Sequence, residues 1–336
     1  MAALLAANEG HASAYGADAI SARVVEQIRA TFEAPEAAVF LVGTGTAANA
    51  LILATLTPPW GTVFCTPMAH INEDECNAPE FFTGGAKLTL VPSPHAKLTP
   101  GALDRAIAAE GTRGVHGPAR GPVSLTQATE KGTIYTVEEL RAICDLAHGY
   151  GLPVHLDGAR FANALVRLGC TPAEMTWKAG IDAVSFGGSK NGLLGVEAVV
   201  FFDPAKADEF AFRRKRGGHL FSKHRYLAAQ MGAYLQGGLW LDMARAANAR
   251  ADRLAEGLRN LPGVTLAWEP QANLMFFRAP RRMHRHLLDA GASYYVWDGD
   301  PQAGDPEAPL MARLVCDWST TEAEVDKFLS LAFAPG

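Results

Sequence analysis

Residues 183–195, AVSFGGSKNGLLG, place a single lysine, Lys190, inside a glycine-rich turn. The apolar residues before and after the turn predict a buried strand on each side. A lysine attacks a carbonyl carbon only after its amine loses a proton, so burial or a nearby cation must lower its pKa. Glycines around it would let a bulky ligand approach the backbone. An ordinary exposed turn lysine has the same pattern, so this stretch alone is a weak signal.

A carboxylate precedes this lysine by one predicted strand. Asp157 is the last residue of the apolar run LPVHLD, and Arg160 follows it in HLDGAR, residues 155–160. A carboxylate at the end of a strand can hold a protonated ring nitrogen, bind a metal, or cap the next helix. Helix capping by aspartate is common, and it is the favoured interpretation of this motif taken alone.

A second glycine turn, GTGTAANA at 43–50, joins a predicted strand to a predicted helix. Backbone N–H groups at a helix N-terminus attract anions such as phosphate. The spacing is not that of a dinucleotide-binding GxGxxG motif, because position 48 is alanine, and no Gly-Lys-Ser/Thr follows as in a P-loop. A phosphate site and a tightly packed helix start therefore both remain open.

Buried strands alternate with helices from residue 37 onward. The helix predicted at 136–151 begins with a capping box, Thr136 followed three residues later by Glu139. This alternation predicts an α/β fold with a mostly parallel sheet covered on both faces, and ligands bind such sheets beyond the carboxyl ends of the strands. The expected strands are 37–42, 62–66, 86–91, 122–126, 152–157, 181–186 and 196–202.

The pattern changes in the last third of the chain. Residues 223–260 predict one long helix, or two with a break at Gly237-Gly238. After Pro262, short apolar runs and helical stretches predict a smaller α+β domain. We therefore expect a large domain over 12–238, a small C-terminal domain over 239–336, and an N-terminal arm, residues 1–11, that packs on the small domain.

Composition limits the possible partners. Of 336 residues, 49% are apolar and 19% charged, and the formal charge is −5, which indicates a globular chain without general affinity for nucleic acid or anionic membranes. The one basic run, Arg213–Arg216, lacks interleaved aromatic residues and fits a solvated helix face. Five scattered cysteines without a CxxC pair favour reduced thiols in the cytoplasm. The sequence shows neither a signal peptide nor a membrane-spanning run.

The three motifs together fit one cofactor. Pyridoxal 5′-phosphate needs a phosphate cradle, an aspartate for its pyridinium nitrogen and a lysine for a Schiff base. The chain offers candidates in that order, at 43–50, Asp157 and Lys190. No metal is required by this arrangement.

Several stretches resemble the threonine aldolase family, in its bacterial low-specificity L-threonine aldolase branch. The resemblance implies the pyridoxal-phosphate-dependent fold of the aspartate aminotransferase type (fold type I), with a large domain and a small one. It runs from about residue 10 to 317, nearly the whole chain. The matching stretches are GHASAYGAD, FLVGTGTAANAL, AHINEDECNAPEFF, GAKLTLV, VSLTQATEKGTIY, LDGARFANALV, CTPAEMTWKAGIDAVSFGGSKNG and, more weakly, MARLVCDW.

The resemblance also implies roles for cofactor-binding residues. Lys190 would form the Schiff base, Asp157 would pair with the ring nitrogen, and His70 would stack on the ring. Lys223 and Arg225, in the basic segment 213–225, would reach a phosphate, across a subunit interface of a dimer or tetramer. The phosphate itself is expected at Gly45, Thr46 and Ala47.

Substrate residues follow from the same resemblance. Arg160 and Arg313 would hold the amino-acid carboxylate, because a guanidinium binds a carboxylate through two parallel hydrogen bonds. Arg313 could also be an ordinary edge-strand arginine. Glu75 matches a family acidic position, with an exposed loop charge as the alternative. His116 matches a second family histidine near the substrate hydroxyl, and the base is expected to be His70, His116 or a water that they orient.

The expected reaction is cleavage of L-threonine, L-allo-threonine or a related β-hydroxy-α-amino acid, including β-aryl ones such as phenylserine, to glycine and an aldehyde. β-Elimination and transamination on the same fold are the alternatives, because the cofactor-holding residues are shared. Family members carry a Ser-Asp-Asn motif upstream of GHASAYGAD, and this chain has none. A cofactor-binding protein with impaired catalysis is therefore a further alternative.

Overall fold

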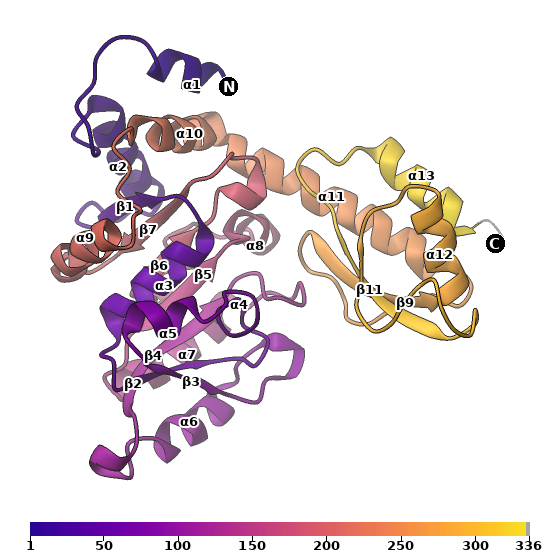
Figure 1. The fold of residues 1–336 in the computed structure, drawn as a ribbon, viewed down its shortest axis with the longest axis horizontal. Coiled ribbons are helices and arrows are strands. Elements are labelled where there is room, and N and C mark those ends of the chain that lie inside the picture. Colours follow the sequence, from indigo (N-terminus) through magenta and orange to yellow (C-terminus); the bar gives the residue numbers. More distant parts are fainter. Residues whose placement is uncertain (334–336) are drawn as a thin grey trace.

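The computed structural model describes residues 1–333, and its larger part is built on one seven-stranded sheet (Figure 1). The strands follow the order β1-β7-β6-β5-β4-β2-β3. Only β7 runs against its two neighbours, so the mostly parallel sheet expected from the sequence is confirmed. The strands are β1 (Ala38–Val42), β2 (Gly61–Cys65), β3 (Lys87–Leu90), β4 (Ala119–Thr126), β5 (Val154–Gly158), β6 (Ala183–Phe186) and β7 (Glu197–Phe201).

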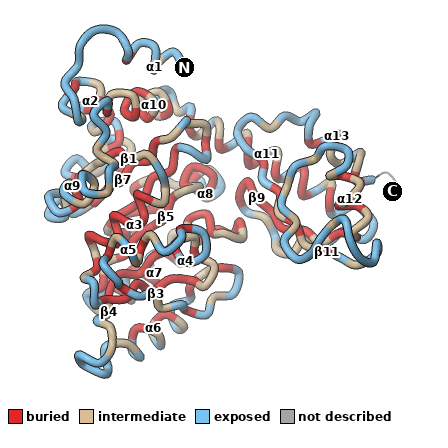
Figure 2. Tube along the Cα trace, in the orientation of Figure 1, coloured by how far each residue is buried: buried red, intermediate tan, exposed pale blue. Residues whose placement is uncertain are grey.

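Helices cover this sheet, and the central strands are buried along their whole length (Figure 2). The capping box at Thr136 and Glu139 is present and starts α7 as expected. The main core packs Leu125, Leu156 and Val184 of the central strands against these helices. The helices of this part are α2 (Ala19–Thr31), α3 (Gly45–Leu56), α4 (His70–Glu73), α5 (Ala78–Thr83), α6 (Pro100–Ala109), α7 (Val137–Gly149), α8 (Phe161–Leu168), α9 (Ala207–Arg216) and α10 (Arg225–Leu235).

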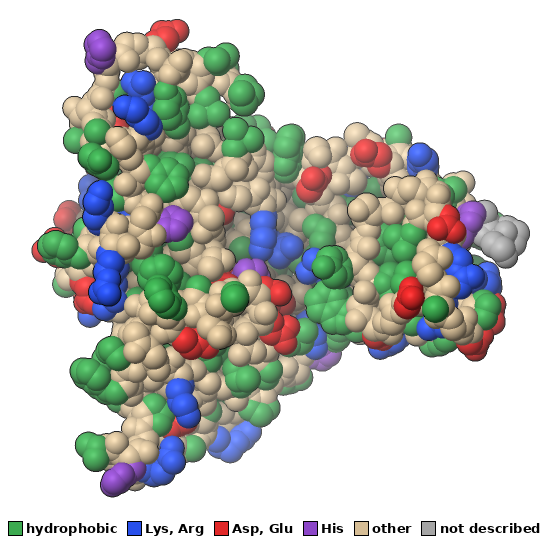
Figure 3. Space-filling view, in the orientation of Figure 1, with side chains coloured by type: hydrophobic (Ala, Val, Ile, Leu, Met, Phe, Trp, Pro, Cys, Tyr) green, Lys and Arg blue, Asp and Glu red, His purple; other side chains and the backbone are tan. Residues whose placement is uncertain are grey.

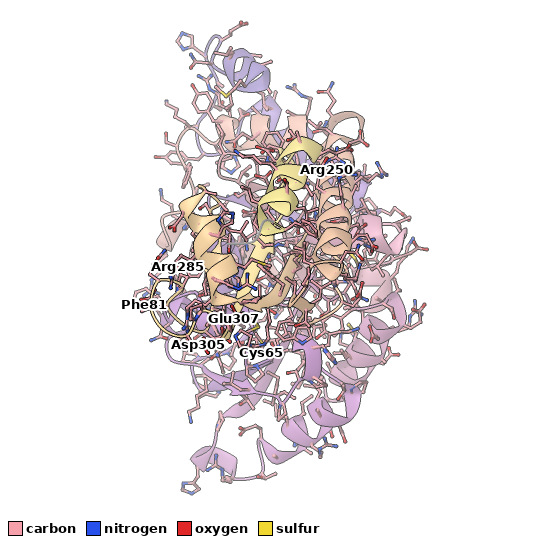
Figure 4. All side chains as sticks on the ribbon, turned by 90° about the vertical axis from the view of Figure 1, so that its right-hand side faces the viewer. Cys65, Phe81, Arg250, Arg285, Asp305 and Glu307 are labelled. Carbon is pink, nitrogen blue, oxygen red and sulfur yellow. The ribbon has the colours of Figure 1, made fainter. Side chains whose placement is uncertain are left out.

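The small domain is a four-stranded antiparallel sheet with two helices on one face. Met275, Phe277 and Leu314 pack toward the helices, whereas Phe276 and Arg313, paired across β9 and β11, lie on the opposite face. In the view onto the small domain, Arg250 lies on α11 and Arg285 on α12 (Figure 4). The elements are β8 (Thr265–Leu266), β9 (Leu274–Pro280), α12 (Arg281–Asp289), β10 (Tyr295–Val296), β11 (Pro309–Val315) and α13 (Glu322–Phe333).

One long helix, α11 (Leu239–Arg259), connects the two parts. Of the two sequence alternatives, two helices are correct, because Gly237 and Gly238 take φ angles of 62° and 77° and end α10. Trp240 at the start of α11 belongs to the large core, whereas Leu254 belongs to the small-domain core. Both parts therefore share this helix, and no helix in residues 1–333 is long and apolar enough to cross a membrane.

The N-terminal arm does not lie where the sequence analysis placed it. Helix α1 (Ala2–Ala7) lies against α10, at the top of the large part and apart from the small domain (Figure 1). The Tyr226 hydroxyl donates a hydrogen bond to Asn8, and Arg225 donates one to the Gly10 carbonyl at 3.2 Å. These contacts hold the arm on the large domain, so the expected packing on the small domain is wrong for this chain.

Candidate active site

A cleft of about 400 Å³ opens at the carboxyl ends of β4, β5 and β6 and at the start of α3. Lysine and arginine side chains gather there, where the large and small parts meet (Figure 3). This is the edge of a parallel sheet at which ligands bind. Six of the residues singled out from the sequence line the cleft, namely Gly45, Thr46, His70, Asp157, Arg160 and Lys190.

Lys190 lies on a 3₁₀ turn, η4 (Ser189–Asn191), directly after β6. Burial in the cleft lowers its pKa, and the positive charge of Arg160 lowers it further. No hydrogen bond or ion pair occupies its amine among the described residues. A lysine in this state keeps more of its amine unprotonated at neutral pH, which is the requirement for attack on a carbonyl.

The glycines before Lys190 serve the protein's own packing. A Cβ on Gly187 would lie 2.6 Å from the Gly158 carbonyl, and one on Gly188 would lie 2.7 Å from the Val196 carbonyl. The interpretation that these two glycines admit a ligand is therefore wrong. They allow the turn to lie against the neighbouring backbone, and the Gly188 N–H donates a 2.6 Å hydrogen bond to Glu197, which fixes the turn.

Asp157 is the penultimate residue of β5, and both of its carboxylate oxygens accept hydrogen bonds. Asn49 donates to Oδ2 at 2.8 Å, and the Ala159 N–H donates to Oδ1 at 2.9 Å. Asn49 is fixed in turn, because its Oδ1 accepts a 2.8 Å hydrogen bond from Ser185. An aspartate bonded in this way keeps a set orientation, so its carboxylate can face a cationic ring nitrogen at the cleft floor.

The glycine turn before α3 forms one end of the cleft. Thr44 is the N-cap, and its hydroxyl accepts a hydrogen bond from the Ala47 N–H at 3.2 Å. Ala47 therefore does not offer a free N–H to a phosphate, and it does not line the cleft. Gly45 and Thr46 do line the cleft. A Cβ on Gly45 would meet nothing within 4 Å, so the space above this turn is open. A helix start with free N–H groups fits a phosphate.

His70 and Glu75 form a pair beside the cleft. Their side chains are 2.8 Å apart between Nδ1 and Oε1, and this bond raises the pKa of His70. Glu75 is 4% exposed, accepts a second bond from Asn49 at 2.9 Å, and does not line the cleft. Both sequence interpretations of Glu75, as a substrate contact and as an exposed loop charge, are thus corrected: it positions His70 and links it to Asp157 through Asn49.

Replacing Glu75 by glutamine should lower the pKa of His70. The glutamine Oε1 can still accept from Asn49, but the neutral amide no longer stabilises the imidazolium. The measurement is an NMR titration of the His70 ring protons. Glu73→Gln is the control, because Glu73 lies on α4 together with His70 but is exposed. An unchanged midpoint in Glu75→Gln would contradict the assigned partner.

Arg160 lines the cleft, whereas Arg313 of the small domain does not line it but lies close enough for its charge to act on Arg160. Burial lowers the pKa of Arg160 to about 10, and the positive charge of Arg313 adds to this effect. Its Nε is buried and has no hydrogen-bond partner among the described residues. Arg313 lies on β11, an inner strand of the small sheet, with its guanidinium over the rings of Tyr295 and Trp297. The edge-strand alternative for Arg313 is therefore excluded. The guanidinium groups of Arg160 and Arg313 are neighbouring cations that can bind one anion.

Three predicted residues lie elsewhere in the same chain. His116 is on the 3₁₀ turn η2 (Gly114–His116), before β4, and so at the amino end of a sheet whose cleft lies at the carboxyl ends. It cannot serve its own chain's cleft. Lys223 and Arg225 line a separate polar hollow of about 100 Å³ with His11 and Ser13 of the N-terminal segment.

The basic run Arg213–Arg216 forms the last turn of α9, where cations interact favourably with the helix dipole. Arg213 pairs with Glu209, and Arg214 lies over the Phe40 ring. The exposed Lys215 and Arg216 fit the expected solvated helix face, whereas Arg214 does not, because its Nε is buried and burial lowers its pKa to about 10. Beyond the run, His219 accepts a hydrogen bond from the Gly43 N–H, so the following loop covers the turn that begins α3.

Three functional side chains were missed from the sequence, namely Asn49, Glu130 and Glu197. Asn49 is the lone amide of α3 and directly precedes its apolar segment ALILATL, and a polar residue there signals a buried hydrogen bond. Glu130 lies four residues beyond the end of β4 (Thr126), at the same edge of the sheet as Asp157, so a search for carboxylates that follow strands would have found it. Glu197 starts β7 as the one charge in a buried strand.

The comparisons with known proteins agree with this geometry. A family model for beta-eliminating lyases matches residues 1–280. The chain is 41% identical over 324 residues to the low-specificity L-threonine aldolase of Pseudomonas sp. (strain NCIMB 10558), with 96% of this chain and 90% of that one covered. The chain is 42% identical to the Pseudomonas aeruginosa protein of the same name, with 95% of this chain and 89% of that one covered. The chain belongs to the threonine aldolase family.

Solved structures extend the threonine aldolase match to three dimensions. The threonine aldolase of Leishmania major superposes with a TM-score of 0.90 at 26% identity, covering 98% of this chain and 93% of that one. A serine palmitoyltransferase from S. paucimobilis, 18% identical, gives 0.70 and shows the shared fold. Threonine aldolases are lyases that depend on pyridoxal 5′-phosphate, and the free helix start, the fixed aspartate and the unpaired lysine fit this cofactor.

Proposed function

We propose that this threonine aldolase cleaves L-threonine, L-allo-threonine and related β-hydroxy-α-amino acids, including β-aryl ones such as phenylserine, to glycine and an aldehyde. The observation that carries the proposal is the convergence of Lys190, Asp157 and the start of α3 in one cleft that also faces Arg160. The 41–42% identity with low-specificity L-threonine aldolases supports the choice of substrate.

Each residue has a separate task in this proposal. When bound, pyridoxal 5′-phosphate supplies an electron sink for the bond that breaks at Cα. Lys190 would hold the cofactor through its amine. Asp157, kept in place by Asn49, would keep the ring nitrogen protonated. His70, whose pKa is raised by Glu75, would contact the ring, and Gly45 and Thr46 would bind the phosphate.

The two arginines decide which bond is broken. A carboxylate held by Arg160 from the large domain and Arg313 from the small one cannot rotate freely. Holding the carboxylate would fix rotation about the N–Cα bond of the substrate, and this rotation decides which of the bonds at Cα is cleaved. Orientation of this kind converts a shared cofactor chemistry into a specific reaction.

Arg313→Ala should raise KM for L-threonine roughly 10- to 100-fold with a smaller change in kcat, because one charge-assisted bond to the carboxylate is lost. Steady-state kinetics with saturating cofactor measure the effect. Arg278→Ala is the matched control, since Arg278 lies on the same strand face of the small sheet and pairs with Asp298. Equal KM values for the two variants would contradict a substrate role for Arg313.

The products distinguish the proposed reaction from its alternatives. Aldol cleavage of L-threonine releases acetaldehyde and glycine, β-elimination releases ammonia and a keto acid, and transamination gives a keto acid with conversion of the cofactor to its amine form. Incubation of cofactor-loaded protein with L-threonine, followed by analysis of all four products, tests this directly. Acetaldehyde with equimolar glycine is expected. Ammonia or a keto acid in its place would overturn the proposed function.

The polar hollow of Lys223 and Arg225 is the proposed contact to a second copy. Arg225 has a buried Nε without a partner among the described residues, and Lys223 is exposed beside it. We place them toward the phosphate of a neighbouring subunit in a homodimer or homotetramer.

The five free cysteines favour a reducing compartment, the cytoplasm.

A further inference from the structure

The cleft contains three carboxylates among its described lining residues, and they differ in how their oxygens are used. Both oxygens of Asp157 accept hydrogen bonds, from Asn49 and from the Ala159 N–H. Both oxygens of Glu197 accept backbone N–H groups, at 2.6 and 3.4 Å. All four oxygens of these two carboxylates therefore already accept hydrogen bonds from protein donors.

Glu130 is different. Its Oε1 accepts hydrogen bonds from the His70 N–H at 3.0 Å and from the Thr126 hydroxyl at 2.7 Å. Its Oε2 is buried and has no hydrogen-bond partner within residues 1–333. One oxygen thus anchors the side chain, and the other is left to accept a proton or a hydroxyl group.

The turn that carries Glu130 is fixed on both sides. The Thr129 N–H donates to the Thr133 carbonyl, and the Gly132 N–H donates to the Thr129 carbonyl, both at 2.9 Å. Lys131 lies over the Trp268 ring of the small domain, 4.3 Å from its centroid. The carboxylate is therefore presented from a rigid turn at the junction of the two parts, as proton transfer in a set geometry requires.

The other candidates for the base are weaker. His116 lies at the opposite end of β4, outside the cleft. The bond to Glu75 raises the pKa of His70 and also occupies its Nδ1, so His70 is less suited to accept a proton.

We infer that Glu130 is the proton-transfer group for the β-hydroxyl of the substrate. The inference deepens the proposed function and rests on it. The O–H bond breaks and its proton moves to Oε2 of Glu130. The oxygen electron pair forms the carbonyl of the aldehyde as the Cα–Cβ bond breaks, and the bound cofactor would supply the electron sink for the pair released from that bond. A proton from solvent completes glycine at Cα, and Glu130 returns its own proton to solvent.

The electrostatic setting suits this task. Burial raises the pKa of Glu130 to about 7, so the group exchanges its proton near neutral pH, where general bases work best. Arg160 and Lys190 favour the carboxylate, whereas Asp157 favours the acid. The titratable and charged groups that face Glu130 are Cys65, His70, Tyr135, Asp157, Arg160 and Lys190.

The test uses Glu130→Gln in the cofactor-loaded enzyme. The glutamine Oε1 can keep both anchoring hydrogen bonds, so only the ability to take a proton is removed. We expect kcat for L-threonine to fall on the order of 10²-fold with little change in KM, and the rise of kcat with pH through about 7 to disappear. Glu130→Asp should recover part of the activity. Glu80→Gln is the matched control, since its Oε2 is also buried without a partner but lies outside the cleft.

Infrared spectroscopy gives a readout that does not depend on turnover. As the pH is raised through neutrality, the wild type should lose a carboxylic-acid carbonyl band. Glu130→Gln should lack this band at every pH, and Glu80→Gln should show it and lose it as the wild type does. A wild type that cleaves L-threonine while Glu130→Gln keeps its full kcat would overturn this inference alone, as would a Glu130 band that titrates only in acid. A wild type that releases no aldehyde from any β-hydroxy amino acid would overturn the proposed function and this inference with it.

Discussion

Lys190→Ala should reduce aldol cleavage on the order of 10⁴-fold or more, since loss of a covalent catalyst removes a whole reaction path. The alanine leaves the cleft open, and Asp157 and Gly45 keep their positions on β5 and α3, so the variant should fold normally. Turnover of L-threonine to acetaldehyde measures the loss.

Two controls separate the amine from its charge and from lysines in general. Lys190→Arg keeps a cation in the cleft but has no amine that can attack a carbonyl, so it should be as inactive as the alanine variant. Lys178→Ala removes an exposed lysine that pairs with Glu33 at 2.6 Å, and it should be fully active.

A chemical readout complements the kinetics. After borohydride reduction and denaturation, the wild type should retain the cofactor on the peptide that contains Lys190, and Lys190→Ala should retain none. Steady turnover by Lys190→Ala, or covalent cofactor on another lysine of the wild type, would contradict the assignment.

The sequence predicted the elements that follow from local pattern. Strand alternation places Asp157 and Lys190 at the ends of neighbouring strands, and parallel strands bring these ends to one edge. The same logic, applied to chain direction, places His116 at the other edge, because it precedes β4. The place near the substrate hydroxyl that the resemblance implies for His116 therefore conflicts with the direction of β4.

Other features depend on packing that local pattern does not contain. Asn49 lies mid-helix, and its contacts with Asp157 and Glu75 depend on how α3 is rotated against the sheet. Position 188 requires glycine because a Cβ there would lie 2.7 Å from the Val196 carbonyl oxygen. This close approach depends on where the chain enters β7, which the local sequence does not show. The N-terminal arm likewise finds its partner, α10, through long-range contacts such as that of Asn8 with Tyr226.

Asp157→Asn should lower kcat on the order of 10³-fold, because a neutral amide cannot keep the ring nitrogen protonated. The substitution also disturbs the hydrogen bonds. Asp157 accepts from Asn49 on one oxygen and from the Ala159 N–H on the other, and an asparagine can accept on only one atom. Asn49 cannot simply turn over, because its Oδ1 already accepts from Ser185.

The two consequences of Asp157→Asn can be measured separately. Loss of ring protonation lowers kcat even at saturating cofactor, whereas disturbed hydrogen bonds weaken cofactor binding and lower the melting temperature. Asp182→Asn is the control, because Asp182 bonds His148 and the Val154 N–H outside the cleft and should affect stability alone. A variant at position 157 that binds the cofactor weakly but keeps full kcat when saturated would limit Asp157 to a structural role. Loss of kcat at saturation, with Asp182→Asn fully active, would place the charge of Asp157 in the chemical step itself.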